Sequence, residues 1–101
     1  MRRYETMVII TDVLDEDAAQ ATFSWAKELL AKHEATLLDE AWWGRRRLAY
    51  EIAKRDYGYY GVLDYEATAE AVAELERQLK ISDDIVRFKT VRPETRVRSA
   101  A

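Results

Sequence analysis

The sequence predicts an α+β fold in which a four-stranded antiparallel sheet carries two helices on one face. Three observations predict it. Segments rich in β-branched and aromatic residues alternate with two segments of helical periodicity, in the order βαββαβ. Hydrophobic residues make up 49% of the chain, which is enough to build a core. The length of 101 residues suits one domain rather than several.

The first two elements are a strand over residues 4–11 and a helix over residues 15–34. The strand contains Val8, Ile9 and Ile10, a nearly continuous apolar run that is typical of a central strand. Acids at the start of the helix can cap its free N–H groups and favour the positive end of its dipole. Residues at intervals of three and four then define one amphipathic face, made of Ala19, Thr22, Phe23, Ala26, Leu30 and His33.

A hairpin follows the first helix. Its first strand, residues 36–50, would be about 50 Å long at roughly 3.3 Å per residue, so we expect it to extend beyond the sheet. The polar residues 54–58 are typical of a turn, and residues 59–65 have the composition of a return strand.

A second helix and a last strand complete the order. Thr68 is the expected cap of a helix that continues to Lys80. The strand over residues 85–91 stops before Pro93, because proline cannot donate to a β-ladder. The apolar face of the second helix consists of Val72, Leu75 and Leu79.

The connections determine how these elements are arranged. Each β-α-β crossover is expected to be right-handed, which places both helices on the same face of the sheet. This is the ferredoxin-like βαββαβ arrangement. We expect residues 1–92 to form a single domain and residues 93–101 to form a short, basic and flexible C-terminal tail.

The residue types that enzymes and metalloproteins need are scarce in this sequence. Cysteine is absent, which excludes disulfides and thiolate metal sites, and His33 is the single histidine. We find no glycine-rich phosphate loop or nucleophile motif, and the adjacent acids Asp39 and Glu40 would point to opposite faces of a strand. We therefore expect no enzyme activity, cofactor, metal or small-molecule substrate.

The sequence also predicts a cytoplasmic protein that does not enter a membrane. It has no run of about 18 apolar residues, the length that a spanning helix requires. The first residues lack the apolar core of a signal peptide.

Charge is distributed unevenly, although the net charge is only −3. Most acids lie in or beside the two predicted helices, so we expect an acidic helical side and a basic rim on the strands. These cations can also be solubility devices that protect an edge strand. The cations outside the helices are Arg2, Arg3, Arg45, Arg46, Arg47, Lys54, Arg55, Arg87, Lys89, Arg92, Arg96 and Arg98.

Aromatic residues crowd the same hairpin. Aromatic rings beside arginine can stack on unpaired bases, and tryptophan with arginine also marks protein–protein contacts. One of Trp42 and Trp43 must face away from the helices, and an exposed indole there would need a partner. The hairpin aromatics are Trp42, Trp43, Tyr50, Tyr57, Tyr59 and Tyr60.

Three segments carry a family resemblance. They are residues 2–5 (Arg-Arg-Tyr-Glu), residues 43–54 (Trp-Gly-Arg-Arg-Arg-Leu-Ala-Tyr-Glu-Ile-Ala-Lys) and residues 57–60 (Tyr-Gly-Tyr-Tyr). Together they closely resemble the family of the sixth protein of the bacterial small ribosomal subunit. The resemblance extends from residue 1 to about residue 92 and includes the order of all six elements.

The resemblance implies a structural protein of the ribosome. It implies binding to the central domain of small-subunit ribosomal RNA together with the eighteenth small-subunit protein, during assembly of the platform. Positions that match the family point to an RNA- or partner-binding surface of Arg2, Arg3, Arg46, Arg47, Tyr50 and Lys54. Arg87, Lys89 and Arg92 match mainly in charge.

Three hairpin residues depart from the family pattern. Trp42, Trp43 and Arg45 make the hairpin bulkier and more basic than the resemblance implies. We include Arg45 among the binding candidates, and the two tryptophans as candidate partner contacts. The alternative function is a ferredoxin-like ligand-sensing or dimerisation module that does not bind RNA, because the fold alone does not choose between them.

Overall fold

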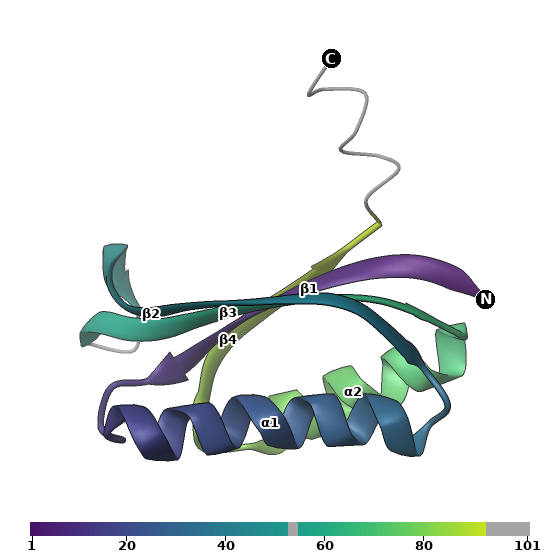
Figure 1. The fold of residues 1–101 in the computed structure, drawn as a ribbon. Helices are drawn as coiled ribbons and strands as arrows, with labels where there is room; N and C mark the ends of the chain where they lie inside the picture. The colour runs from purple at the N-terminus through teal and green to yellow at the C-terminus, as the bar shows by residue number, and fades with distance from the viewer. Residues whose placement is uncertain (53–54, 93–101) are drawn as a thin grey trace.

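The fold has two layers, a four-stranded antiparallel sheet and a pair of helices that covers one of its faces (Figure 1). The computed structural model describes residues 1–52 and 55–92. The strand order is β2-β3-β1-β4, which confirms the predicted ferredoxin-like fold. The elements are β1 (Arg2–Thr11), α1 (Glu16–Lys32), β2 (Thr36–Ile52), β3 (Arg55–Ala67), α2 (Ala69–Ile81) and β4 (Ile85–Val91).

α2 begins at the predicted cap, Thr68, and the cap of α1 is Asp15, one of the acids expected at the start of that helix. The side chain of Asp15 accepts a hydrogen bond of 2.8 Å from a backbone N–H of the first turn of α1, and Thr68 accepts one of 3.2 Å in α2. Each bond satisfies a donor that has no partner within its helix. α1 ends at Lys32, two residues earlier than predicted, because Glu34 has a φ of 65°, a left-handed conformation that a helix cannot continue through.

The hairpin strands are longer than predicted, and the turn predicted over residues 54–58 is wrong for residues 55–58, which belong to a strand. β3 already begins at Arg55, and β2 continues to Ile52, two residues further than expected. In Figure 1 the last part of β2 rises away from the helix layer, and the polar residue Asp56 of β3 is exposed. Lys54, a candidate site residue, and the predicted tail over residues 93–101 lie outside the described residues.

Gly58 is a packing residue and not a turn residue. It lies between Arg46 of β2 and Thr11 of β1 in the sheet. A Cβ atom at this position would lie 2.6 Å from Cγ2 of Ile9 and 3.6 Å from Cδ2 of Leu48. Because Ile9 and Leu48 are both buried, the sheet needs a glycine there to bring them together.

The main core lies between the sheet and the helices. Phe23 of α1 and Leu75 of α2 belong to one buried cluster with Leu63 and Tyr65 of β3. Gly61 makes room for Phe23, because a Cβ atom at Gly61 would lie 2.5 Å from Cε1 of the ring. The helix layer therefore sits closer to β3 than a side chain at this position would allow.

Tyr65 combines full burial with a hydrogen bond. Its hydroxyl lies 2.7 Å from the hydroxyl oxygen of Thr6, which is also buried. Burial raises the pKa of Tyr65, because the core disfavours the charged phenolate. The unfolded chain therefore loses this proton first as the pH rises. The stability that Tyr65 contributes is fully present below about pH 10 and is lost as the pH rises through the raised pKa.

Replacement of this tyrosine makes that pH dependence measurable. We expect Tyr65→Phe to lower the free energy of unfolding by about 1 kcal/mol at pH 7, because Thr6 loses its partner. The difference from the unaltered chain should shrink above about pH 10. Urea denaturation between pH 7 and about pH 11 tests this, and a difference that stays constant with pH would contradict it.

Candidate functional site

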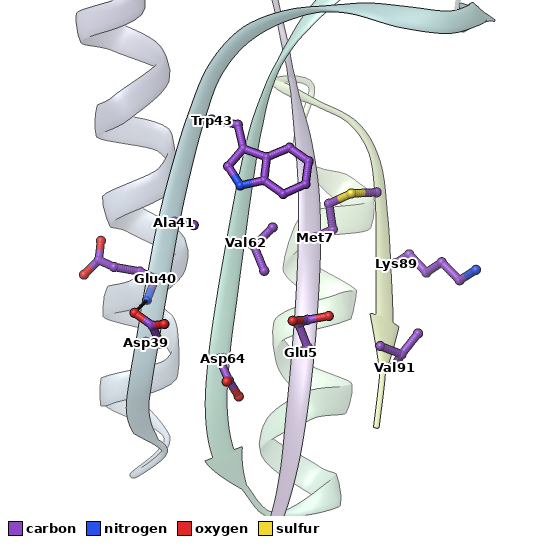
Figure 2. Close-up of a pocket in the computed structure, with 10 residues that line it drawn as sticks. All are labelled: Glu5, Met7, Asp39, Glu40, Ala41, Trp43, Val62, Asp64, Lys89 and Val91. Carbon is purple, nitrogen blue, oxygen red and sulfur yellow. Dashed lines mark hydrogen bonds between the residues drawn. The ribbon is translucent and has the colours of Figure 1, made fainter. Parts of the chain in front are cut away.

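A bulge in β2 separates the two neighbouring tryptophans of the hairpin. Trp42 pairs with Gly61 and Gly44 pairs with Tyr60, so Trp43 is the extra residue. Gly44 has a φ of 79°, which other residues rarely adopt. Trp42 turns toward α1, and Trp43 lies on the open face, the face of the sheet that the helices do not cover (Figure 2). This confirms the prediction that one indole faces away from the helices.

Trp42 is held between the sheet and α1. Its ring centroid lies 5.3 Å from that of Phe23 and 5.9 Å from that of Tyr59. Its indole Nε1 donates a hydrogen bond of 3.0 Å to the carboxylate of Glu16 in α1. These contacts make Trp42 part of the packing of the hairpin on the helix layer, away from the open face.

Trp43 belongs to an exposed cluster. Its side chain is 49% exposed and stacks on Tyr60, with 6.1 Å between the ring centroids and 13° between the ring planes. The guanidinium of Arg46 lies 6.0 Å from the Trp43 ring centroid, and its Nε donates to the Trp43 carbonyl at 3.1 Å. An apolar ring and a cation are thus presented side by side to solvent.

Arg45, Arg46 and Arg47 form what we name the hairpin basic surface. All three are exposed but not on a single face of the hairpin, because successive strand residues alternate: Arg46 lies beside Trp43 of the open face, whereas Arg45 lies beside Tyr57. The guanidinium of Arg45 lies 4.1 Å from the ring centroid of Tyr57 and 3.5 Å from the carboxylate of Asp12. These contacts orient the arginine, whose planar group matches the geometry of phosphate oxygens. Asp12 was missed in the sequence because it lies far from Arg45 along the chain.

The other candidate cations lie elsewhere on the sheet. Arg3 pairs with Glu66 of β3, and Arg46 pairs with Gly58 of the same strand. Glu66 and Gly58 are eight residues apart, so Arg3 and Arg46 lie about 26 Å apart along the strand direction. Nε of Arg3 donates to Oδ1 of Asp64 at 2.9 Å.

The structure therefore divides the predicted binding residues into two groups instead of one surface. Arg2, Arg3 and Arg92 lie toward the end of the sheet that is remote from the hairpin tip. Arg87 and Lys89 lie between the groups, on the edge strand β4. Tyr50 belongs to β2 beyond the three arginines.

Sequence reasoning missed a hollow at the centre of the open face. Its volume is about 420 Å³. Carboxylates of Glu5, Asp39 and Asp64 line it, so the expected separation of acidic helices from basic strands is incomplete. The sequence did contain a signal of this feature. The central strand β1 is apolar on both of its faces, and such a strand needs a covering layer on each face. The other lining residues are Met7, Glu40, Ala41, Trp43, Val62, Lys89 and Val91.

Asp39 and Glu40 point to opposite faces, as predicted. The carboxylate of Glu40 accepts a hydrogen bond of 2.7 Å from Nζ of Lys27 in α1, whereas Asp39 lines the open face. The two carboxylates therefore do not form a pair that could share acid–base work. Within residues 1–52 and 55–92, no group of three metal-ligating side chains comes together. The helices of this part of the chain are too short or too polar to span a bilayer.

The sequence model of the ribosomal protein S6 family matches residues 3–92. The chain belongs to the ribosomal protein S6 family. Small ribosomal subunit protein bS6 of Salinispora arenicola is 43% identical over 96 residues, which cover 95% of this chain and all of the relative. The bS6 protein of a Sulfurovum species is 44% identical over 92 residues, which cover 91% of this chain and 72% of the relative.

A solved member of the S6 family agrees in fold. The crystal structure of 30S ribosomal protein S6 from Thermotoga maritima has a TM-score of 0.87 and 27% sequence identity, and the match covers 98% of this chain and 96% of the other. The S6 relatives are named as ribosomal proteins and not as enzymes, which confirms the expectation of a non-enzymatic protein. Membership of the family also confirms the expected cytoplasmic location.

Proposed function

We propose that this protein binds the central domain of small-subunit ribosomal RNA together with the eighteenth small-subunit protein and aids assembly of the platform. The observation that carries the proposal is the hairpin basic surface, Arg45 to Arg47, on a chain of the ribosomal protein S6 family. The RNA supplies phosphates to these arginines, and unpaired bases can stack on the neighbouring rings.

The geometry of the hairpin favours RNA at this end of the molecule. The three arginines are exposed, and the rings of Tyr57 and Trp43 lie beside two of them. Ring and backbone contacts restrict the guanidinium groups before RNA binds, so less conformational entropy is lost on binding. We propose Tyr50 and Lys54 as further RNA contacts, as the family resemblance implies.

A protein partner is needed because the chain attracts RNA weakly at long range. Its net charge is −3, and carboxylates occupy the centre of the open face. RNA that approaches the hairpin therefore meets favourable charge over a small area only. A basic partner that binds the acidic part of the surface would enlarge the positive area. We assign Arg2, Arg3, Arg87, Lys89 and Arg92 to a second contact surface for RNA or partner.

Salt provides the first test of this proposal. We expect the pair of proteins to bind a central-domain RNA fragment with an affinity that falls linearly in a plot of log K against log salt concentration. Two or three phosphate contacts from this chain contribute a slope of about −2 to −3. Titrations from 50 to about 300 mM KCl, with each protein alone and with both, measure the slope and the cooperativity.

The outcomes separate the two functions considered for this fold. Binding that is tighter with both proteins than with either alone supports the ribosomal function. The ribosomal function is contradicted if no mixture binds the RNA, or if the RNA affinity does not change with salt concentration. Dimerisation of the chain alone, without affinity for RNA, would favour the alternative of a dimerisation module.

A further inference from the structure

Two arginines of the hairpin basic surface approach solvent from opposite sides of the sheet. Directly paired residues of neighbouring strands share a face of the sheet. Arg45 pairs with Tyr59, which belongs to the buried core beneath the helices. Arg45 therefore lies on the side that carries the helices, whereas Arg46 lies beside Trp43 of the open face. A ligand of Arg45 consequently reaches the hairpin from the helix side.

Two contacts fix the guanidinium group of Arg45. Its central carbon lies 4.1 Å from the ring centroid of Tyr57, so the ring covers one face of the planar group. One of its terminal nitrogens lies 3.5 Å from the carboxylate of Asp12, which occupies part of its edge. The side chain of Arg45 is nevertheless 52% exposed, so the opposite face of the guanidinium is available to a ligand.

Asp12 belongs to a loop that the fold holds in place. The N–H of Leu14 donates to the carbonyl of Thr11 at 3.4 Å and closes a turn around Asp12. The carbonyl of Leu14 accepts a hydrogen bond of 3.0 Å from the hydroxyl of the buried Tyr59. The side chain of Asp12 itself is only 14% exposed. The carboxylate, and with it the plane of Arg45, is therefore oriented before any RNA arrives.

The charge around Arg45 favours a base over a phosphate. The carboxylate of Asp12 offsets the positive charge of the guanidinium and repels a phosphate that approaches it. A nucleobase carries no net charge, and unpaired bases stack on guanidinium planes in RNA complexes. Arg46 differs, because its Nε donates to the neutral carbonyl of Trp43, a contact that does not offset its charge toward a phosphate.

We propose that Arg45 forms the floor of a subsite for an unpaired base of the RNA, and that Asp12 is its positioning residue. The base stacks on the guanidinium face opposite Tyr57, so that ring, guanidinium and base form three layers. Phosphates contact Arg46 and Arg47 instead. This inference rests on the proposed function and deepens it, because it gives one of the three arginines a different ligand.

Salt dependence separates the two kinds of ligand. Arg45→Ala should weaken binding of the protein pair to the central-domain RNA fragment about tenfold at every salt concentration between about 50 and 300 mM KCl, because stacking releases no counterion. The slope of log K against log salt concentration should change by less than about 0.3. Arg45→Lys should behave in the same way, because lysine keeps the charge but has no plane on which a base can stack. Arg46→Ala should instead lower the magnitude of the slope by about 1.

Substitution of Asp12 tests its positioning role. Asp12→Asn removes the carboxylate charge, so Arg45 loses its orientation and becomes more attractive to a phosphate. We expect RNA binding about threefold weaker at about 300 mM KCl, with a slope that becomes steeper by about 0.5 to 1. Asp12→Glu keeps the charge and should keep the original slope. A merely structural role of Asp12 would change the thermal stability without this change of slope.

Arg77→Ala is the matched control for these variants. Arg77 is an exposed arginine of α2 whose guanidinium is also paired with a carboxylate, that of Glu74. Its replacement should change the RNA affinity less than about twofold at every salt concentration.

A measurement on the unaltered chain avoids any effect of the substitutions on folding. In ¹H–¹⁵N spectra of the protein pair, the RNA fragment should move the Nε–H resonance of Arg45 upfield, because the ring current of a stacked base shields this proton. The resonance is assigned by its absence from the spectrum of Arg45→Lys. A downfield shift, which a hydrogen bond to phosphate produces, or the absence of a shift would overturn the inference.

The remaining outcomes distinguish the inference from the proposed function. If Arg45→Ala lowers the magnitude of the slope by about 1 and its effect disappears at high salt, a phosphate is the ligand, and the inference is wrong while the proposed function is retained. If calorimetry without RNA shows that Arg45→Ala weakens binding of the eighteenth small-subunit protein, Arg45 contacts the protein partner and the inference is wrong. If the unaltered pair does not bind the RNA at all, the proposed function fails and the inference fails with it.

Discussion

Replacing Phe23 by alanine is expected to lower the free energy of unfolding by about 3–5 kcal/mol, the largest effect on stability that we predict. The ring is 4% exposed and fills the space that Gly61 leaves open above β3. It also contacts Trp42, with 5.3 Å between the ring centroids. Alanine leaves a cavity that neither neighbour can fill, because Gly61 has no side chain and Trp42 is tethered to Glu16.

Urea denaturation of Phe23→Ala beside two comparison variants measures this effect. Ser24→Ala replaces an exposed neighbour on the same helix and should change the stability by less than about 0.5 kcal/mol. Phe23→Leu keeps most of the volume and should cost less than the alanine variant. A loss below about 1 kcal/mol for Phe23→Ala would show that the hairpin and α1 repack without the ring.

The double replacement Arg46→Ala and Arg47→Ala is expected to weaken RNA binding by the protein pair about 10- to 100-fold, while the fold is retained. Both side chains are exposed, so their removal creates no cavity. Each arginine that neutralises a phosphate releases counterions, and its loss lowers the magnitude of the salt slope by about 1. Binding should therefore weaken most at low salt and converge toward the unaltered protein at high salt.

Filter binding or fluorescence anisotropy over a salt series tests this expectation, with thermal unfolding as the check on the fold. Arg77→Ala is the matched control, because Arg77 is an exposed arginine of α2 whose partner is Glu74. Its removal should leave the RNA affinity unchanged. Replacing Arg46 and Arg47 by lysine should restore the salt slope more fully than the affinity, because lysine keeps the charge and loses the planar geometry. If the alanine variant unfolds, these arginines stabilise the fold, and the loss of binding is not evidence that they contact RNA.

The elements of the fold could be predicted because their signals are local. Thr68 and Asp15 cap helices through hydrogen bonds to residues three positions away. Such short-range interactions can be recognised from neighbouring residues in the sequence. Gly58 was misinterpreted because its reason is not local. The atom that excludes a side chain there belongs to Ile9, on a strand that the sequence does not show to be adjacent.

The residue types of the candidate site could be predicted from the sequence. The separation of its basic residues into two groups could not. The exposure of Trp43 followed from the alternation of a strand, whereas the ion pair of Arg3 with Asp64 joins residues 61 positions apart. The sequence also could not show that the acids Asp39 and Glu5 share a hollow, because that depends on the order of the strands. A basic rim was therefore expected where the structure has two basic ends and an acidic centre.

The strand order has a consequence for the timing of folding during synthesis. β1 is made first, yet its two neighbours in the sheet are β3 and β4, and β4 ends only at Val91. Both edges of β1 therefore lack a partner until β3 is complete at Ala67, and one edge lacks a partner until β4 is complete. Synthesis adds about 5–20 residues per second, so on the order of several seconds pass between the completion of β1 and the completion of β4. A chain truncated before β4 would therefore leave one edge of the central strand β1 exposed for pairing with another chain.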